Sequence, residues 1–156
     1  MSRAFTREDD SEGAIADIGE RPVSTHRNLV TASGLTQIDA AVAELREHLA
    51  KAEADADRER IATVSRDLRY WSSRRESAEL SEPEPDSEVV RFGMSVTLEG
   101  EDGKRKTWKI VGEDEADAAK GSVSHVSPMA LALFGKSVGE IATVNGKEWE
   151  IVGLKS

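Results

Sequence analysis

The chain has 156 residues, and its 30 acidic residues outnumber its 21 lysines and arginines to give a net charge of −9. This length suits one domain or one domain with an appendage. The acidic balance argues against duplex DNA binding, which depends on neutralising phosphates. The absence of cysteine excludes disulfides and cysteine-based zinc sites, and no stretch approaches the ~20 apolar residues of a membrane span. We expect a cytoplasmic protein with no membrane contact.

The first segment, residues 1–27, mixes charges with Gly and Ser and shows no sustained hydrophobic period. A segment of this composition has too little apolar surface to fold alone. We therefore predict a flexible N-terminal arm.

The second segment, residues 28–80, carries two apolar seams with helical spacing. They consist of Leu35, Ile38, Val42, Leu45, Leu49 and Ala52, and then of Ile61, Val64, Leu68 and Trp71. Alternating steps of three and four residues are typical of coiled-coil helices. Glu53 to Glu59, between the seams, contains no apolar residue except alanine. The segment is therefore predicted to form an antiparallel helical hairpin with arms about 30 Å long.

The third segment, residues 81–88, reads SEPEPDSE and holds four acids and no base. Its two prolines and its like-charge repulsion predict a stiff, solvated linker.

The last segment, residues 89–156, changes to the period of strands. Turn signals at Asp102-Gly103 and Asn145-Gly146 each separate two strand-like runs and predict two β-hairpins. Between them, Ser127 as N-cap, Pro128 at the first helical position and Gly135 at the end predict one short helix. The expected fold class is α+β: a helical hairpin followed by an antiparallel sheet of four or five strands with one helix.

Several segments resemble, in the same order, those of the Gre family of bacterial transcript-cleavage factors. The similar segments are Phe92-Gly93, IVGEDEAD at 110–117, the Ser-Pro frame at 127–139, the helix opening at 28–45 and RDLRYWSSR at 66–74. The resemblance covers roughly 125 residues and leaves the N-terminal arm out.

This resemblance implies a coiled-coil hairpin followed by an FKBP-like domain without isomerase activity. In the family, that domain docks on RNA polymerase at the rim of the secondary channel. The hairpin then enters the channel, and two acids at its tip help to hold a catalytic Mg²⁺ that the polymerase uses to cleave backtracked RNA. The chain would thus be a monomeric transcription elongation factor, with no catalytic residue, metal or cofactor of its own beyond a possible share in that Mg²⁺.

The resemblance also assigns candidate contacts. The polymerase-docking candidates are Asp114, Glu115, Asp117, Ser127, Pro128 and Met129, and the candidate tip carboxylates are Asp55, Asp57 and Glu59. The simpler alternatives stay open, because charge runs are usually solvated and Ser127-Pro128 also serves as a helix cap. Arg66 and Arg69 could meet acidic channel walls or form weak surface ion pairs between the helices.

Three departures from the family pattern direct the functional prediction. The acidic tip motif of the family is absent, and the hairpin is about two turns shorter per arm, a loss of about 10 Å of reach. Because Mg²⁺–oxygen bonds of ~2.1 Å tolerate little displacement, we expect binding that modulates elongation or competes with other channel binders, without efficient cleavage. Val126 also replaces the polar residue usual before the Ser-Pro pair.

Two other interpretations stay open. One is a polymerase binder like the nucleoside diphosphate kinase regulator, which also pairs a short hairpin with this domain. The other is an interaction module for an unrelated protein partner. An active prolyl isomerase is disfavoured, because only 4% of the residues are aromatic and could line a proline pocket.

Overall fold

The computed structural model describes residues 19–156. Their contacts divide them into two compact units, one formed by residues 19–25 with 38–77 and the other by 26–37 with 78–156. The elements are β1 (Leu29–Val30), α2 (Ala32–Ala54), α3 (Arg58–Ser77), β2 (Glu79–Leu80), β3 (Ser95–Gly100), β4 (Arg105–Val111), the 3-10 turn η1 (Ala118–Lys120), β5 (Ser122–Ser124), α4 (Pro128–Leu133), β6 (Ile141–Val144) and β7 (Lys147–Lys155). Residues 1–18, most of the predicted flexible arm, lie outside this description.

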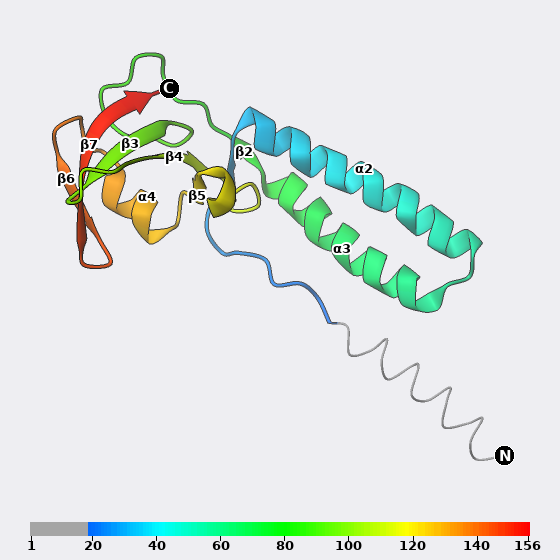
Figure 1. The fold of residues 1–156 in the computed structure, drawn as a ribbon. Coiled ribbons are helices and arrows are strands. Elements are labelled where there is room, and N and C mark those ends of the chain that lie inside the picture. Colours follow the sequence, from blue (N-terminus) through cyan, green and yellow to red (C-terminus); the bar gives the residue numbers. More distant parts are fainter. Residues whose placement is uncertain (1–18) are drawn as a thin grey trace. The chain divides into compact units, whose positions relative to one another are not determined.

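The first unit contains most of the predicted helical hairpin, residues 38–77, in which α2 and α3 run antiparallel (Figure 1). Ile38, Val42 and Val64 of the predicted seams are buried. An ion pair of 2.6 Å between Asp39 and Arg75 also joins the two helices. The hairpin is therefore confirmed, and its apolar seams are the surfaces that the helices bury.

The turn between the helices is shorter than the predicted break and ends α2 with a left-handed residue. Ala56 has a φ of 51°, its N–H donates to the carbonyl of Glu53, and the N–H of Asp57 donates to the carbonyl of Ala52. This is the Schellman arrangement, in which glycine usually occupies the left-handed position. The Asp57 carboxylate then accepts a hydrogen bond from the Arg60 N–H at 3.2 Å and caps α3.

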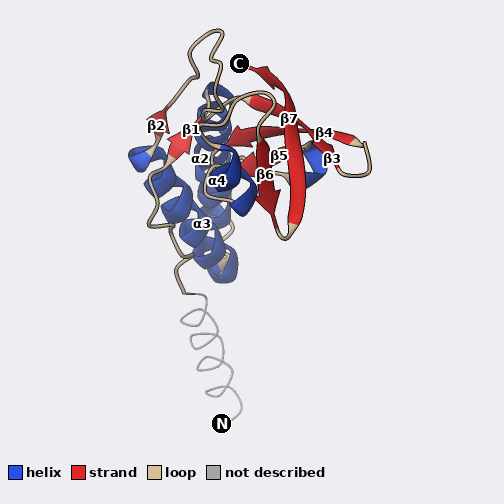
Figure 2. Ribbon diagram, turned by 90° about the vertical axis from the view of Figure 1, so that its left-hand side faces the viewer, coloured by secondary structure: helices blue, strands red, loops and turns tan. Residues whose placement is uncertain are grey.

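The second unit contains a curled sheet of five strands in the order β5-β4-β3-β7-β6. Figure 2 shows these strands in red. Both predicted β-hairpins are present, β3–β4 and β6–β7. At the second turn Asn145 and Gly146 have φ of 52° and 76°, the left-handed pair that a two-residue hairpin requires.

One pair in this sheet differs from the antiparallel prediction, because β5 runs parallel to β4. A parallel partner needs a connection that carries the chain back along the sheet. Residues 112–121, including η1, form that connection. Periodicity does not reveal strand direction, so the three-residue β5 escaped the sequence interpretation.

The core of this unit lies between α4 and the sheet. Ala130 and Leu133 of α4 are buried in one cluster with Leu98, Ile110 and Ile151 from three strands. The helix is short, but its i and i+3 positions both face the sheet, as an amphipathic helix requires.

The short parallel strands β1 and β2 also belong to this unit, although neither was predicted. Leu29 pairs with Glu79 and Val30 with Leu80. Arg27 donates to both carboxylate oxygens of Glu79, at 3.0 and 3.3 Å, and this hydrogen-bonded pairing lowers the pKa of the Glu79 carboxyl. Strands of two residues carry no detectable period, so only the folded chain reveals them.

The first turn of α2 is fixed by an acid from the loop after β4. Thr31 accepts a hydrogen bond from the Gly34 N–H at 3.0 Å, and its hydroxyl donates to the Glu115 carboxylate at 2.6 Å. A Cβ atom at Gly34 would collide with that carboxylate. The absence of a side chain at Gly34 therefore lets Glu115 reach the positive end of the helix dipole.

The acidic segment 81–88, which we predicted to be a linker, makes contacts within the second unit. The carbonyl of Glu84 accepts a hydrogen bond from the Ser156 hydroxyl at 3.2 Å. Pro83 lies so close to Gly93 that a Cβ there would be 2.9 Å from its ring. Two prolines restrict the chain to extended conformations that can lie along a surface as well as in solvent.

Across residues 19–156, none of the helices combines the length and the apolar character that crossing a membrane would need.

We predict that Ala56→Gly stabilises the hairpin by about 1 kcal/mol, because a left-handed conformation strains a residue with a Cβ and suits glycine. Urea unfolding followed by circular dichroism measures the change. Ala50→Gly, at an exposed site within α2, is the matched control and should destabilise by about 1 kcal/mol. Equal destabilisation by both variants would contradict the role assigned to the turn.

We predict that Gly34→Ala and Glu115→Ala are strongly coupled. In the wild type, the added methyl displaces the Glu115 carboxylate and destabilises the protein, whereas with Glu115→Ala it gains up to about 1 kcal/mol of helix propensity. A double-mutant cycle should give a coupling free energy of about 1 kcal/mol or more. Ser33→Ala, at the exposed neighbouring position, should not couple to Glu115→Ala. Additive effects of the Gly34 and Glu115 changes would disprove the contact.

Candidate functional site

The docking candidates of the second unit come together through the parallel pair β4–β5. In a parallel pair, both carboxyl ends lie at the same edge of the sheet, and here Val111 at the end of β4 pairs with Ser124 at the end of β5. The loop at 112–117 follows β4, and the turn into α4 follows β5. The unpredicted parallel pair thus brings the acidic loop and Ser127-Pro128 to one edge.

Glu115 and Asp117 in this loop each have a defined hydrogen-bond partner within the chain. Glu115 binds Thr31, and Asp117 is the N-cap of η1, accepting from the Ala119 N–H at 3.0 Å. The Asp117 N–H also donates to the Ser122 hydroxyl at 2.9 Å. These acids therefore shape the loop, whatever contact they make with a partner.

The acidic loop borders a groove whose lining is mixed in charge. Its charged lining residues are Lys109, Asp114, Glu115, Asp117 and Lys120. The two lysines lie on either side of the acidic run in the sequence, and neither was among the predicted docking candidates. A partner on this groove would meet three carboxylates and two ammonium groups, an arrangement that favours a specific orientation over simple attraction.

The turn into α4 is both a helix cap and an exposed surface. Ser127 accepts a hydrogen bond from the Ala130 N–H at 3.2 Å, and Pro128 occupies the start of the helix. Pro128 is exposed and Met129 is half-buried. Met129 packs against the core cluster, so Pro128 offers more free surface to a partner.

Leu131 is a candidate contact that the sequence interpretation did not single out. Its side chain is 64% exposed, whereas Ala130 and Leu133 on the other face of α4 are fully buried. Leu131 lies three residues after Pro128, and residues at this spacing share a helix face. The i, i+3 relation to Pro128 could have identified it from the sequence.

The tip of the hairpin presents the three other candidate acids, Asp55, Asp57 and Glu59, and all are exposed. They are not gathered into a group that could hold a metal ion, and no such group of three or more His, Asp or Glu side chains occurs in residues 19–156. One oxygen of Asp57 already accepts the Arg60 N–H. The tip residues thus do not fit a Mg²⁺ site of their own.

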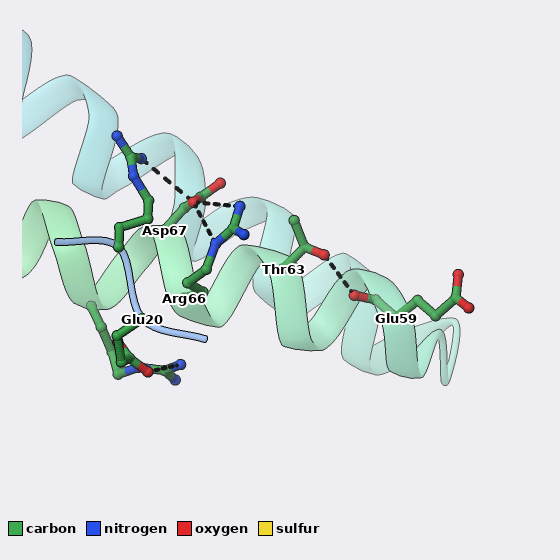
Figure 3. A network of polar contacts seen from close by, with 7 residues as sticks. Glu20, Glu59, Thr63, Arg66 and Asp67 are labelled. Atoms are coloured by element: carbon green, nitrogen blue, oxygen red, sulfur yellow. Dashed lines mark hydrogen bonds and ion pairs between the residues drawn. The ribbon is translucent and has the colours of Figure 1, made fainter. Parts of the chain in front are cut away.

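The two candidate arginines on the side of the hairpin are both paired within the first unit. Arg66 donates to Asp67 at 3.3 Å, and Arg69 binds the Glu20 carboxylate, with a shortest distance of 2.6 Å. Figure 3 shows Glu20 on the chain segment that runs beside α3. The hydrogen bond to Arg69 lowers the pKa of the Glu20 carboxyl. Both arginines thus form ion pairs in this structure, but neither pair joins the two helices. Arg66 pairs with its neighbour Asp67 on α3, and Arg69 pairs with Glu20 of the N-terminal segment.

Comparison with known proteins places these features in a family. The family model described as "Transcription elongation factor, GreA/GreB, C-term" matches residues 84–155. Transcription elongation factor GreA of Alkalilimnicola ehrlichii is 39% identical over 126 residues, which cover 74% of this chain and 79% of that protein. GreA of Bradyrhizobium sp. is 47% identical over 73 residues, which cover 44% of this chain and only 46% of that protein.

Among solved structures, that of GreA factor homolog 1 (Gfh1) of Thermus thermophilus is similar, with a TM-score of 0.42 and 19% identity. The match covers 84% of this chain and 100% of that one. The identity to GreA of A. ehrlichii extends over three quarters of the chain, more than the sheet unit alone contains. The chain therefore belongs to the GreA/GreB family of transcription elongation factors.

Proposed function

We propose that this protein binds bacterial RNA polymerase and modulates elongation, or competes with other factors for the secondary channel, without stimulating transcript cleavage efficiently. The second unit would dock at the channel rim, and the hairpin would enter the channel. The proposal extends the family assignment, which supports a role in transcription elongation, to a mode of action for this chain.

The construction of the tip is the observation that carries the proposal. The helices are joined by a tight turn in which Asp57 caps α3, and the three tip acids do not form a metal-holding group. Mg²⁺ demands near-octahedral geometry at 2.0–2.1 Å and dehydrates reluctantly, so exposed carboxylates on a compact turn, one of which already caps α3, are poor ligands. A short hairpin can still occupy space in a channel and exclude other binders, since exclusion requires volume and not ligand geometry.

The docking surface would combine a polar part and an apolar part. The mixed-charge groove beside Asp114 supplies orientation, and the exposed face of Pro128 and Leu131 supplies apolar area. Interfaces draw most of their binding energy from a few desolvated residues, with charges at the rim setting the rate and orientation of docking. Leu131 is the natural anchor, because it is exposed without contributing to the core.

We predict that Leu131→Asp weakens binding to RNA polymerase about tenfold or more, the effect of losing one apolar anchor. Because Leu131 is exposed, the melting temperature should hardly change. Val138→Asp makes the same kind of change at another exposed apolar position outside α4, and it should bind like the wild type. Binding is measured with purified polymerase by biolayer interferometry. An equal loss of affinity in both variants would show that α4 is not part of the interface. If the wild type did not bind polymerase, the proposed function would be wrong.

We predict that the wild-type protein leaves the RNA in stalled, backtracked elongation complexes at full length. Gel analysis of labelled RNA shows the outcome. Asp57→Ala is a poor probe here, because losing the cap would cost the hairpin about 1 kcal/mol. Asp57→Asn retains the capping oxygen and removes only the charge, and it is combined with Asp55→Asn. Shortened RNA with the wild type that is lost with the double variant would overturn the proposed mode of action.

A further inference from the structure

The N-terminal segment ahead of β1 is held on the side of α3 by three different contacts. The Glu20 carboxylate accepts from Arg69 at 2.8 and 3.0 Å as well as forming the 2.6 Å ion pair. The Arg21 guanidinium reaches Asp67 at 3.4 Å. The same guanidinium lies 4.0 Å from the centre of the Tyr70 ring and 5.9 Å from that of Trp71. Residues 19–25, which we call the strap, therefore follow a defined course along α3 (Figure 3).

These contacts use chemistry that recognises a specific dipeptide. A guanidinium and a carboxylate form charge-assisted hydrogen bonds, and the face of a tyrosine ring attracts a cation. The surface of α3 made by Asp67, Arg69 and Tyr70 thus fits an acid followed directly by a cation, which is the order of Glu20 and Arg21.

The charges of the strap and the helix support the same pairing. Helix α3 carries six arginines against three acids, a net charge of +3. The strap carries one acid, Glu20, and one base, Arg21, so its own net charge is zero. Each of these charges meets an opposite charge on α3, Glu20 at Arg69 and Arg21 at Asp67. The strap is therefore placed to occupy the side of the hairpin that carries Arg69.

We propose that the strap is a built-in competitor, which occupies the Asp67–Tyr70 surface of α3 and must release before that side of the hairpin can meet an acidic partner surface. The competition part of this proposal rests on the proposed function, because the competing partner is the wall of the polymerase channel. The binding of the strap to α3 is a property of the isolated protein and does not depend on polymerase. A partner that binds only the released state has its apparent affinity reduced by the fraction of molecules in which the strap is released.

The occupied state is tested in the full-length protein without polymerase. Three tryptophans give three indole N–H signals in a ¹H–¹⁵N spectrum, and Trp71→Phe assigns the one beside the strap. Glu20→Arg and Arg69→Glu each place like charges together, and both should shift the Trp71 signal. The charge-swapped double variant should return it toward the wild-type position. Arg58→Glu, the matched change at the start of the same helix, should not shift it. An unchanged Trp71 signal in both single variants would show that the strap does not bind.

The competition is tested by polymerase affinity. Glu20→Arg should tighten binding at least about twofold at low salt, since it raises the released fraction. Glu20→Arg also makes the chain more positive by two charges. Glu148→Arg, the same change at an exposed position on β7, is therefore the control, and it should tighten polymerase binding less than Glu20→Arg does. Equal affinity of Glu20→Arg and Glu148→Arg, with a shifted Trp71 signal, would overturn the competition. If neither the wild type nor any variant bound polymerase, both the proposed function and the competition would be wrong. The spectra would still show whether the strap binds α3.

Discussion

A parallel pair of two-residue strands fixes both ends of the helical hairpin. Strand β1 leads into α2 and β2 follows α3, so pairing Leu29 with Glu79 holds the entry and the exit of the hairpin at the spacing of neighbouring strands. Without this pair, the helices would be joined only at their tip and along their seam. Thr31 and Glu115 then fix the first turn of α2. The spacing of the two hairpin ends thus depends on backbone pairing. The first turn of α2 depends on one part-buried contact between a hydroxyl and a carboxylate.

The loops that carry the docking candidates also build the fold. Glu115 holds the start of α2, Asp117 caps η1 and Ser127 caps α4. A polar residue can satisfy backbone N–H groups and still face solvent on its other side, because a carboxylate has several lone pairs. The acidic run therefore shapes its own loops, and in the groove its carboxylates lie beside Lys109 and Lys120. The two lysines make the candidate docking surface mixed in charge, although the sequence around it is strongly acidic.

In the hairpin, by contrast, the proposed function depends on charged side chains that do not bind a metal ion at the tip and that are already paired along α3. Within residues 19–156 the tip carboxylates do not form a metal-holding group, and the two arginines on the side of α3 are engaged by Asp67 and Glu20. Ion pairs that are partly or fully exposed to solvent contribute little to stability, since solvent and salt screen them. Their weakness is useful for a contact that must be reversible, because a partner with a denser array of acids can displace a single glutamate.

Local signals in the sequence were enough to predict several elements: the two helices from their seams, the β-hairpins from Asp102-Gly103 and Asn145-Gly146, and α4 from Ser127-Pro128. Each depends on residues within a few positions, so period and turn chemistry suffice. Four features were visible only in the folded chain: the β1–β2 pair, the parallel direction of β5, the contact of Glu115 with Thr31 and that of Glu20 with Arg69. These join residues that are 13 to 84 positions apart, and no local propensity specifies which distant partner a two-residue strand or an exposed charge will meet.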